Sequence, residues 1–269
     1  MQQPTSLFPQ IFDAIDKADR VLLVSDAKPD GDSVGSTTAM LTWMRRERKN
    51  VMAFSIVPIP RSLLYLDGAH EITSDPSVFK QPYDLVLTFD ASDPRRSGIT
   101  ALRPLIPSHP PLVVFDHHAT NERYGDTNII LTDACATAEV VYRFFEACNV
   151  PIDDRMATSL LTGICTDTSC FHNGGTSVKG MEAAGRLFAY GARYGDILRH
   201  LIHDKSVDHL RLWGLALSRL NHHPTFDLVS TFFLLQDTSG HPNDEATDGV
   251  ANFLHAVCGG ADAILVLKE

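Results

Sequence analysis

Residues 21–36 read VLLVSDAKPDGDSVGS, an apolar run that predicts a buried strand, followed by a loop and the start of a helix. The loop carries Asp26, Asp30 and Asp32 within seven residues. Carboxylates this close repel one another unless a cation neutralises them, and hard divalent ions such as Mg²⁺ and Mn²⁺ prefer carboxylate oxygens. Gly31 allows a sharp turn, and Ser33 is the predicted N-cap. The stretch indicates a strand, loop and helix with a metal site, although a plain turn and helix cap would use the same residues.

A second acidic position follows a second predicted strand. Leu85–Phe89 is apolar throughout and leads directly to Asp90. Parallel α/β sheets bind ligands just beyond the carboxyl ends of their strands, so Asp90 is a candidate metal ligand. Arg95 and Arg96 come shortly after it, and a guanidinium at this edge could bind a substrate phosphate in a bidentate way. A solvated loop is an equally good interpretation of the two arginines.

A third strand end combines an acid with two imidazoles. Leu112–Phe115 is followed at once by Asp116, His117 and His118. Imidazole is the most common nitrogen ligand for protein-bound metals, and two adjacent histidines after an aspartate are hard to explain structurally. Asp167 ends an apolar helical run, where a carboxylate opposes the helix dipole and a nearby cation would offset that cost. These residues extend the candidate metal site to four segments.

The first two-thirds of the chain alternate apolar runs with helical patterns, which predicts the α/β class: a mostly parallel sheet with helices on both faces. The predicted strands are Val21–Val24, Val51–Ile56, Leu85–Phe89, Leu112–Phe115 and Asn128–Leu131. The predicted helices are Leu7–Lys17, Ser33–Arg48, Thr137–Cys148, Asp153–Thr166 and Ser177–Tyr190.

From about Tyr194 the pattern changes and predicts a small α/β C-terminal domain. Its expected elements are helices at Asp196–Ile202, Ser206–Asn221 and Asp248–Cys258 and strands at Leu228–Leu235 and Ala263–Leu267. Because the chain stops at Glu269, shortly after a strand, we expect this domain to be truncated or naturally short. His222-His223 predicts a surface turn, and Trp43 and Trp213 are expected in cores.

Composition narrows the function. The chain has 269 residues, a net charge of −10 and 44% hydrophobic residues, and no apolar run in it is long enough to cross a membrane. Its first twenty residues lack the basic start and apolar core that are typical of a secretory signal. No basic stripe suited to long duplex nucleic acid is present, whereas bound cations would still draw a small phosphorylated substrate into an acidic pocket. The five cysteines form no CxxC pair and suit a reducing cytoplasm, so we expect a cytoplasmic protein without a membrane partner.

Taken together, the four segments resemble the DHH phosphoesterase family. The motifs appear in order as Asp26-Ala-Lys-Pro-Asp30-Gly-Asp32-Ser-Val-Gly-Ser36, Asp90, Asp116-His-His118 and Gly163-Ile-Cys-Thr-Asp-Thr168. The resemblance covers roughly residues 5–190, and the C-terminal third is similar to the start of the companion DHHA1 domain. It implies a catalytic domain at 1–192, a helical linker at 193–225 and a partial DHHA1-like substrate-binding domain at 226–269.

The resemblance also implies a site with two Mn²⁺ ions, for which Mg²⁺ could substitute. Asp30 and Asp90 would hold the first ion with Asp26 beside them, and Asp32, Asp90, His117 and Asp167 would hold the second. His118 would contact the scissile phosphate, and Asp116 would orient a histidine. A water activated by the two ions would be the nucleophile.

The implied activity is hydrolysis of short oligonucleotides, dinucleotides such as pApA, or 3′-phosphoadenosine 5′-phosphate, as in oligoribonucleases of this family. Two alternatives remain. One is an inorganic pyrophosphatase of the DHH type, although the basic phosphate clamps of that group are not evident here. The other is a non-catalytic nucleotide-binding protein with a weakened metal site.

Two departures from the family pattern matter. The family normally begins its first motif with histidine, and this chain has Asp26, which is shorter and adds negative charge. The glycine-rich Gly-Gly-Gly-His segment that grips the far end of the substrate is missing, since Gly259-Gly260 is only a pair. Missing strands would leave an exposed sheet edge, which favours a homodimer.

Overall fold

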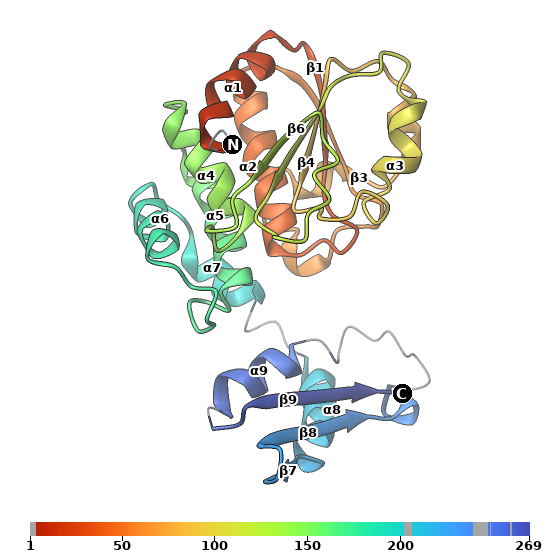
Figure 1. Ribbon diagram of the computed structural model, residues 1–269, viewed down its shortest axis with the longest axis vertical. Helices are drawn as coiled ribbons and strands as arrows, with labels where there is room; N and C mark the ends of the chain where they lie inside the picture. The colour runs from red at the N-terminus through yellow and green to blue at the C-terminus, as the bar shows by residue number, and fades with distance from the viewer. Residues whose placement is uncertain (1–3, 202–205, 239–246, 248, 259) are drawn as a thin grey trace. The chain divides into compact units, whose positions relative to one another are not determined.

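The computed structural model describes residues 4–201, 206–238, 247, 249–258 and 260–269 (Figure 1). The described residues form two compact units, the first ending at Leu201 and the second beginning at Ser206. All five cysteines belong to this described part and are free thiols.

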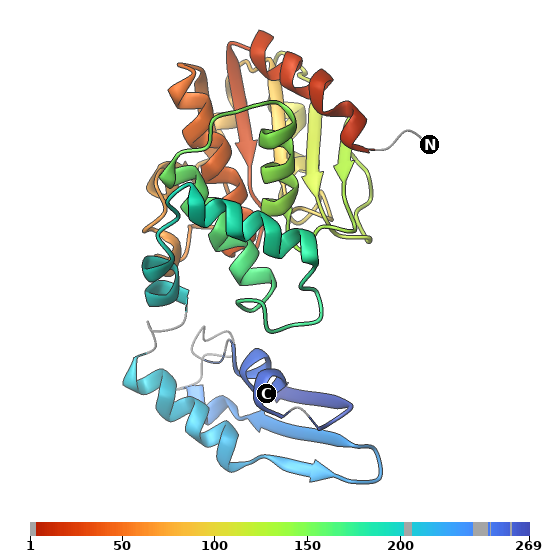
Figure 2. The same ribbon diagram turned by 90° about the vertical axis from the view of Figure 1, so that its left-hand side faces the viewer.

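The first unit is built on a parallel sheet of six strands in the order β3-β2-β1-β4-β5-β6. The strands are β1 (Arg20–Val24), β2 (Asn50–Phe54), β3 (Ile72–Thr73), β4 (Leu85–Phe89), β5 (Leu112–Asp116) and β6 (Thr127–Ile130). Neighbouring strands all pair in parallel, and Figure 2 shows their arrows pointing the same way. The chain progresses outward from β1 to β3 and then returns to β4, beside β1. This reversal between β1 and β4 creates the crevice at which α/β sheets bind ligands.

Helices cover both faces of the sheet, as predicted, but unequally (Figure 1). One face carries α1 (Phe8–Lys17), α2 (Gly31–Arg46), α4 (Thr137–Ala147) and α5 (Asp154–Asp167). The other face is covered by the short α3 (Ile99–Leu102) and by 3-10 turns at Pro76–Lys80 and Arg103–Leu105. Alternate residues of β1 divide between the two cores because successive side chains of a strand point to opposite faces. α6 (Val178–Ala189) and α7 (Tyr194–Leu201) complete the unit.

Aromatic packing holds the helical layer to the sheet. Phe144 of α4 meets Phe8 edge-on, with ring centroids 5.5 Å apart, and makes a similar 5.5 Å contact with Phe115 of β5. Trp43 of α2 lies 6.0 Å from the same ring and is 5% exposed, which confirms its predicted place in the core. Rings at these distances and angles stabilise the core beyond their burial alone.

Two glycines bring α2 unusually close to its neighbours. A Cβ on Gly35 would lie 2.3 Å from the carbonyl oxygen of Ser159 in α5. A Cβ on Gly163 of α5 would lie 2.5 Å from Cβ of Ala138 and 2.7 Å from Oδ1 of Asp32. The backbone approach that these glycines permit places the first turn of α2 against both α5 and the start of α4.

The cap of α2 differs from the prediction. Asp30, not Ser33, is the N-cap, since its Oδ1 accepts hydrogen bonds from the backbone N–H groups of Asp32 at 3.1 Å and Ser33 at 2.9 Å. The Ser33 hydroxyl in turn accepts from the N–H of Asp30 at 3.1 Å, which completes a capping box. The prediction of Ser33 was wrong because aspartate and serine are equally good caps, and the extended backbone of Asp30 (φ −117°, ψ −172°) decides between them.

Other differences are small. β2 ends at Phe54 rather than Ile56. β3 was not predicted, since two residues cannot show a period-two pattern.

The second unit is a three-stranded sheet packed on two helices. Its elements are α8 (Val207–Ser218), β7 (Asn221–His223), β8 (Leu228–Phe233), α9 (Val250–Val257) and β9 (Ala263–Lys268). β8 pairs with β7 antiparallel and with β9 parallel. The core contains Leu212, Ala216, Phe233, Val250 and Leu254, with Trp213 packed against it. His222-His223 belongs to β7, so the predicted surface turn at this pair was wrong.

The predicted linker at 193–225 contains elements of both units: α7 belongs to the first, and α8 and β7 to the second. The predicted helix limits at Ile202 and Asp248, and Gly259, lie outside the described residues. Among the helices of the described ranges, none combines the length and apolar character needed to cross a membrane.

We expect Gly35→Ala to destabilise the protein, because a methyl group would clash with a backbone carbonyl that cannot rotate away. Overpacking of this kind costs about 1–3 kcal/mol. The matched control is Gly185→Ala in α6, where a Cβ would meet no atom of the described residues within 4 Å. Removing a glycine from that open helical position should stabilise the fold by about 0.5–1 kcal/mol. Urea unfolding of the two variants measures both effects, and equal stability would contradict the close approach of α2 and α5.

Candidate functional site

Six predicted site residues converge where β1, β4 and β5 end. Two groups of potential ligand atoms each lie within 4.8 Å of one another. The first group is Asp32, His117 and Asp167, and the second is Asp90, Asp116, His117 and His118. Because His117 belongs to both, the two groups form one continuous site.

His117 lies at the centre of this site. Its Nε2 is 3.1 Å from Oδ2 of Asp167, 3.8 Å from Oδ1 of Asp90 and 3.9 Å from Oδ2 of Asp32. This buried nitrogen makes no hydrogen bond within the described part of the chain. Burial disfavours the imidazolium, but the carboxylates of Asp167 and Asp32 outweigh burial and raise the pKa of His117 to about 9. Nε2 of His117 and the carboxylate oxygens around it are all atoms that can bind a divalent cation. The residues present therefore fit a metal ion.

Asp32 is fully buried, and its carboxylate accepts hydrogen bonds from the N-terminus of α4. Its Oδ1 accepts the N–H of Ala138 at 2.7 Å, and its Oδ2 accepts the N–H of Thr137 at 2.6 Å. Both donors belong to the first turn of α4, whose own N-cap residue, Ala136, provides no side-chain cap. The N-terminal end of α4 favours the negative charge, although burial and the charge of Asp167 raise the pKa of Asp32 well above its ordinary value.

Asp90 has a left-handed backbone with φ 61° and is 8% exposed. Aspartate tolerates this conformation better than most residues. Oδ1 accepts the hydroxyl hydrogen of Thr137 at 3.0 Å and lies 3.5 Å from Nδ1 of His118. Burial, followed by the charge of Asp32, raises the pKa of Asp90 well above its ordinary value.

Asp116 organises the two histidines. Its Oδ1 accepts the backbone N–H groups of His117 at 2.7 Å and His118 at 3.0 Å, and it lies 2.8 Å from Nδ1 of His118. Its Oδ2 accepts a hydrogen bond from Asn121 at 2.6 Å. Burial opposes ionisation, but the hydrogen bonds from His118 and Asn121 outweigh it and lower the pKa of Asp116. An ionised Asp116 can only accept, so Nδ1 of His118 carries the hydrogen and Nε2 is left for other partners.

Asp26 and Asp30 lie on the loop after β1 but in neither group of ligand atoms. Oδ2 of Asp26 accepts the N–H of Lys28 at 3.2 Å, within its own loop. Asp30 uses its Oδ1 to cap α2 and is exposed, although its charge contributes to the raised pKa of Asp32.

The two arginines after β4 differ in their partners. Arg95 is exposed and forms ion pairs with Asp93 and Glu122, at 2.9 Å and 2.6 Å. Arg96 is also exposed, and within the described ranges its guanidinium makes no hydrogen bond or ion pair. Arg96 is therefore the arginine that can bind an incoming anion without breaking an existing pair.

Three supporting residues were missed by sequence reasoning. Thr137 donates a hydrogen bond to Asp90 and Asn121 donates one to Asp116, while the Tyr124 hydroxyl donates to the carbonyl oxygen of Ala91 at 2.9 Å, next to Asp90. Each acts across a separation that no local motif marks. The one available signal was the polar start of α4, where a helix without a side-chain cap requires an acceptor from elsewhere.

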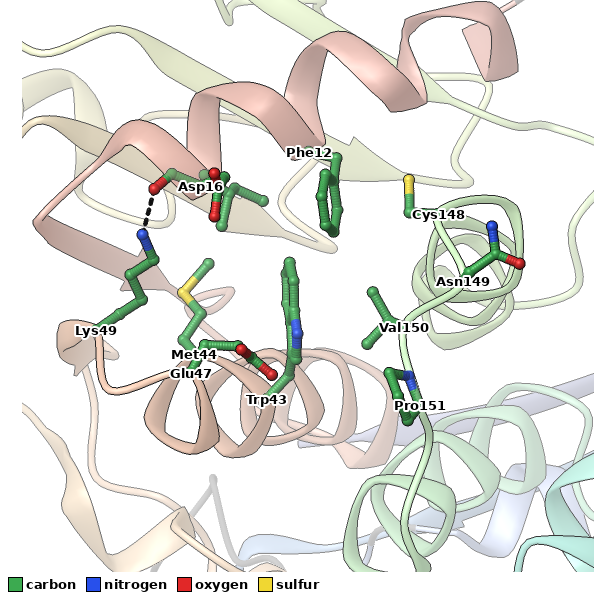
Figure 3. A pocket seen from close by; sticks show the side chains of 11 residues that line it. Phe12, Asp16, Trp43, Met44, Glu47, Lys49, Cys148, Asn149, Val150 and Pro151 are labelled. Carbon is green, nitrogen blue, oxygen red and sulfur yellow. Dashed lines mark hydrogen bonds between the residues drawn. The ribbon is translucent and has the colours of Figure 1, made fainter.

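A cavity of about 140 Å³ lies away from these residues, at the other end of α2 (Figure 3). It is lined by Phe12 and Trp43 on one side and by Cys148, Val150 and Pro151 on the other. None of the six convergent residues lines it. The candidate site is therefore marked by its chemistry rather than by hollow volume.

Comparison with known proteins is consistent with this geometry. The DHH family, N-terminal domain, matches residues 20–164, which is more than half of the chain. The bifunctional oligoribonuclease and PAP phosphatase NrnA of Thermus thermophilus is 26% identical over 249 residues, covering 93% of this chain and 72% of that protein.

Solved structures share the fold. An exopolyphosphatase-related protein from Bacteroides fragilis superposes with a TM-score of 0.83 at 20% identity, covering 92% of this chain and 75% of the other. A Methanococcus jannaschii protein assigned to the family II inorganic pyrophosphatases has a TM-score of 0.53 at 13% identity, covering 92% and 83%.

We expect Asp90→Asn to stabilise the metal-free protein at neutral pH. The raised pKa of Asp90 means that the folded state holds its proton more tightly than the unfolded state. Its contribution to stability is therefore present at low pH and is lost as the pH rises from about 4 through the folded-state pKa. Asparagine keeps the left-handed backbone and the Thr137 contact but cannot ionise.

Thermal unfolding in EDTA at pH 4.5 and 7.5 measures this effect. The variant should lose less stability over this interval, with each kcal/mol appearing as about 2–4 °C in Tm. Asp16→Asn, on the exposed side of α1, controls for the loss of one negative charge. Parallel pH profiles for wild type and Asp90→Asn would contradict the raised pKa.

Proposed function

The chain belongs to the DHH family of phosphoesterases, and on that basis we propose that it is a metal-dependent hydrolase of short phosphorylated nucleotides. The proposed substrates are short oligonucleotides, dinucleotides such as pApA, and 3′-phosphoadenosine 5′-phosphate. The proposed cofactor is a pair of Mn²⁺ ions, with Mg²⁺ as the alternative.

One observation carries the proposal: acids and imidazoles from four separate segments meet at the switch point between β1 and β4. Burying Asp32 and Asp90 together costs much free energy without compensation, and a bound cation would provide that compensation. Sites of this composition, with oxygen donors and one imidazole, suit Mn²⁺ and Mg²⁺ better than softer metals.

We assign Asp32, Asp90, His117 and Asp167 to one ion. Asp30 and Asp90 are assigned to the other, with Asp26 beside them, so that Asp90 is shared. When bound, such ions favour deprotonation of an attacking water and neutralise charge that develops on the phosphate oxygens. His117 must be neutral to act as a ligand, so binding should release a proton below its pKa of about 9.

His118 and Asp116 are assigned to the phosphate. Because Nδ1 of His118 is engaged by Asp116, its ring is held in one orientation, and its half-exposed edge presents Nε2 to the crevice. In the protonated state this nitrogen donates a hydrogen bond to a phosphate oxygen. Asp116 fixes the tautomer and the orientation of the ring. Arg96, whose guanidinium has no ion-pair partner among the described residues, is assigned to a more distant phosphate of the substrate. Arg95, which is paired with Asp93 and Glu122, is assigned to support of the loop.

The substrate class is supported by the Thermus thermophilus relative, whose name states activity on oligoribonucleotides and PAP. The net charge of −10 also favours small substrates over long duplexes. The likeness to a family II pyrophosphatase assignment concerns the fold, so pyrophosphate serves as the comparison substrate.

We expect purified protein with Mn²⁺ to release mononucleotides from pApA and phosphate from 3′-phosphoadenosine 5′-phosphate, with little release from pyrophosphate. Asp90→Asn should lower turnover by more than the roughly 10–100-fold loss typical of residues that only support a metal ligand. Chromatography of the products measures the activity. Faster cleavage of pyrophosphate than of pApA would show that the protein is an inorganic pyrophosphatase instead. Nucleotide binding without turnover would support a non-catalytic role.

The unusual Asp26 provides a separate test. Replacing Asp26 with histidine lengthens the side chain and removes one negative charge from a crowded site. We expect turnover at limiting Mn²⁺ to rise in Asp26→His. Unchanged turnover would show that aspartate already serves at this position, and the wild type and variant can be compared in the same pApA assay.

A further inference from the structure

We propose that Thr137 is a positioning residue whose hydroxyl group holds Asp90 in place for metal binding, while its backbone holds Asp32. This inference rests on the proposed function, because it concerns the same metal site. It adds a residue that lies outside the four motifs carrying the acids and histidines.

Thr137 contacts two carboxylates at once. Its N–H donates to Oδ2 of Asp32 at 2.6 Å, and its hydroxyl donates to Oδ1 of Asp90 at 3.0 Å. The side chain is fully buried, so no water can replace the hydroxyl from the solvent side. Asp32 follows β1 and Asp90 follows β4, so one residue of α4 joins the two sides of the crevice.

The hydroxyl of Thr137 does not donate to a carbonyl of its own helix, α4. Buried threonines inside helices, such as Thr37 and Thr162, donate their hydroxyl hydrogen to the carbonyl four residues earlier, at 2.8 Å in both cases. Thr137 is the first residue of α4, where no earlier helical carbonyl exists, and its hydroxyl points across to Asp90 instead. The contact is therefore specific to the site rather than a by-product of helix formation.

The hydrogen bond from Thr137 to Asp90 counteracts the repulsion between the carboxylates of Asp32 and Asp90. Asp32 and Asp90 carry like charges in a nearly solvent-free space, and each would move away from the other if its oxygens were free. A hydroxyl hydrogen on Oδ1 of Asp90 holds the carboxylate on the side of His117 and His118, whose ring nitrogens lie 3.8 Å and 3.5 Å away. The ligands are thus oriented before a cation arrives, which lowers the cost of binding it.

The test compares Thr137→Val, which keeps size and backbone N–H but removes the hydroxyl, with Thr137→Ser, which keeps the hydroxyl. Thr37→Val is the matched control for replacing a buried threonine with valine. Mn²⁺ affinity is measured by equilibrium dialysis of metal-free protein without substrate, and kcat and KM for pApA are measured in parallel. Thermal unfolding shows that each variant is folded, and Thr137→Ala replaces Thr137→Val in the comparison if the latter does not fold.

We expect Thr137→Val to weaken Mn²⁺ binding by about 10–100-fold, the range typical for loss of a group that orients a metal ligand. Thr137→Ser and Thr37→Val should bind Mn²⁺ like the wild type. In Thr137→Val, kcat for pApA should fall while KM changes little, because the hydroxyl does not touch substrate.

Three results would overturn the inference: unchanged Mn²⁺ binding in Thr137→Val, an equal loss in Thr137→Ser, or an equal loss in Thr37→Val. The dialysis result is independent of hydrolysis. If the wild type cleaves none of the proposed substrates but Thr137→Val alone loses Mn²⁺ affinity, the proposed function fails and the positioning role of Thr137 stands.

Discussion

A carboxylate without access to solvent needs compensation from its surroundings, and Asp32 imposes that requirement on the whole first unit. Two backbone N–H groups at the start of α4 provide part of it, which requires the first turns of α2 and α4 to lie against each other. That meeting is possible only because Gly35 and Gly163 let α2 lie against α5 with almost no side chain between them. The remaining compensation comes from His117, whose ring nitrogen faces the same carboxylate.

The strand order gives this arrangement its direction. β1 and β4 are parallel neighbours, but the chain continues from β1 toward one edge of the sheet and from β4 toward the other edge. The segments that follow the two strands therefore diverge and leave a crevice between their first residues. Acids from both segments and imidazoles from the next strand end therefore face one another. Asp116 and Asn121 then fix the orientation of the imidazole nearest to the opening. Fold and site thus have a common origin in the placement of three strand ends.

Sequence reasoning could predict the parts of this site that depend on topology alone. Carboxyl ends of parallel strands share one edge, so the convergence of Asp32, Asp90 and His117 follows from their places after apolar runs. The orientation of Asp26 could not be predicted, since its own loop competes for its carboxylate through the N–H of Lys28. The role of Thr137 was equally hidden, because its partner Asp90 lies 47 positions earlier and neither residue carries a local signal of the other.

The unequal covering of the sheet has a consequence for motion. Four helices, α1, α2, α4 and α5, cover one face of the sheet. The short α3 and 3-10 turns cover the other face. Short elements have few cooperative hydrogen bonds, so their amides should exchange with solvent by local opening well before those of α2 and α5. The rigid side of the crevice therefore carries Asp32 and, through the hydroxyl of Thr137, holds Asp90, whereas Arg96 lies farther along the loop that leads to the short α3. The part of this loop near Arg96 can therefore change shape while the close contact of α2 with α5 is kept.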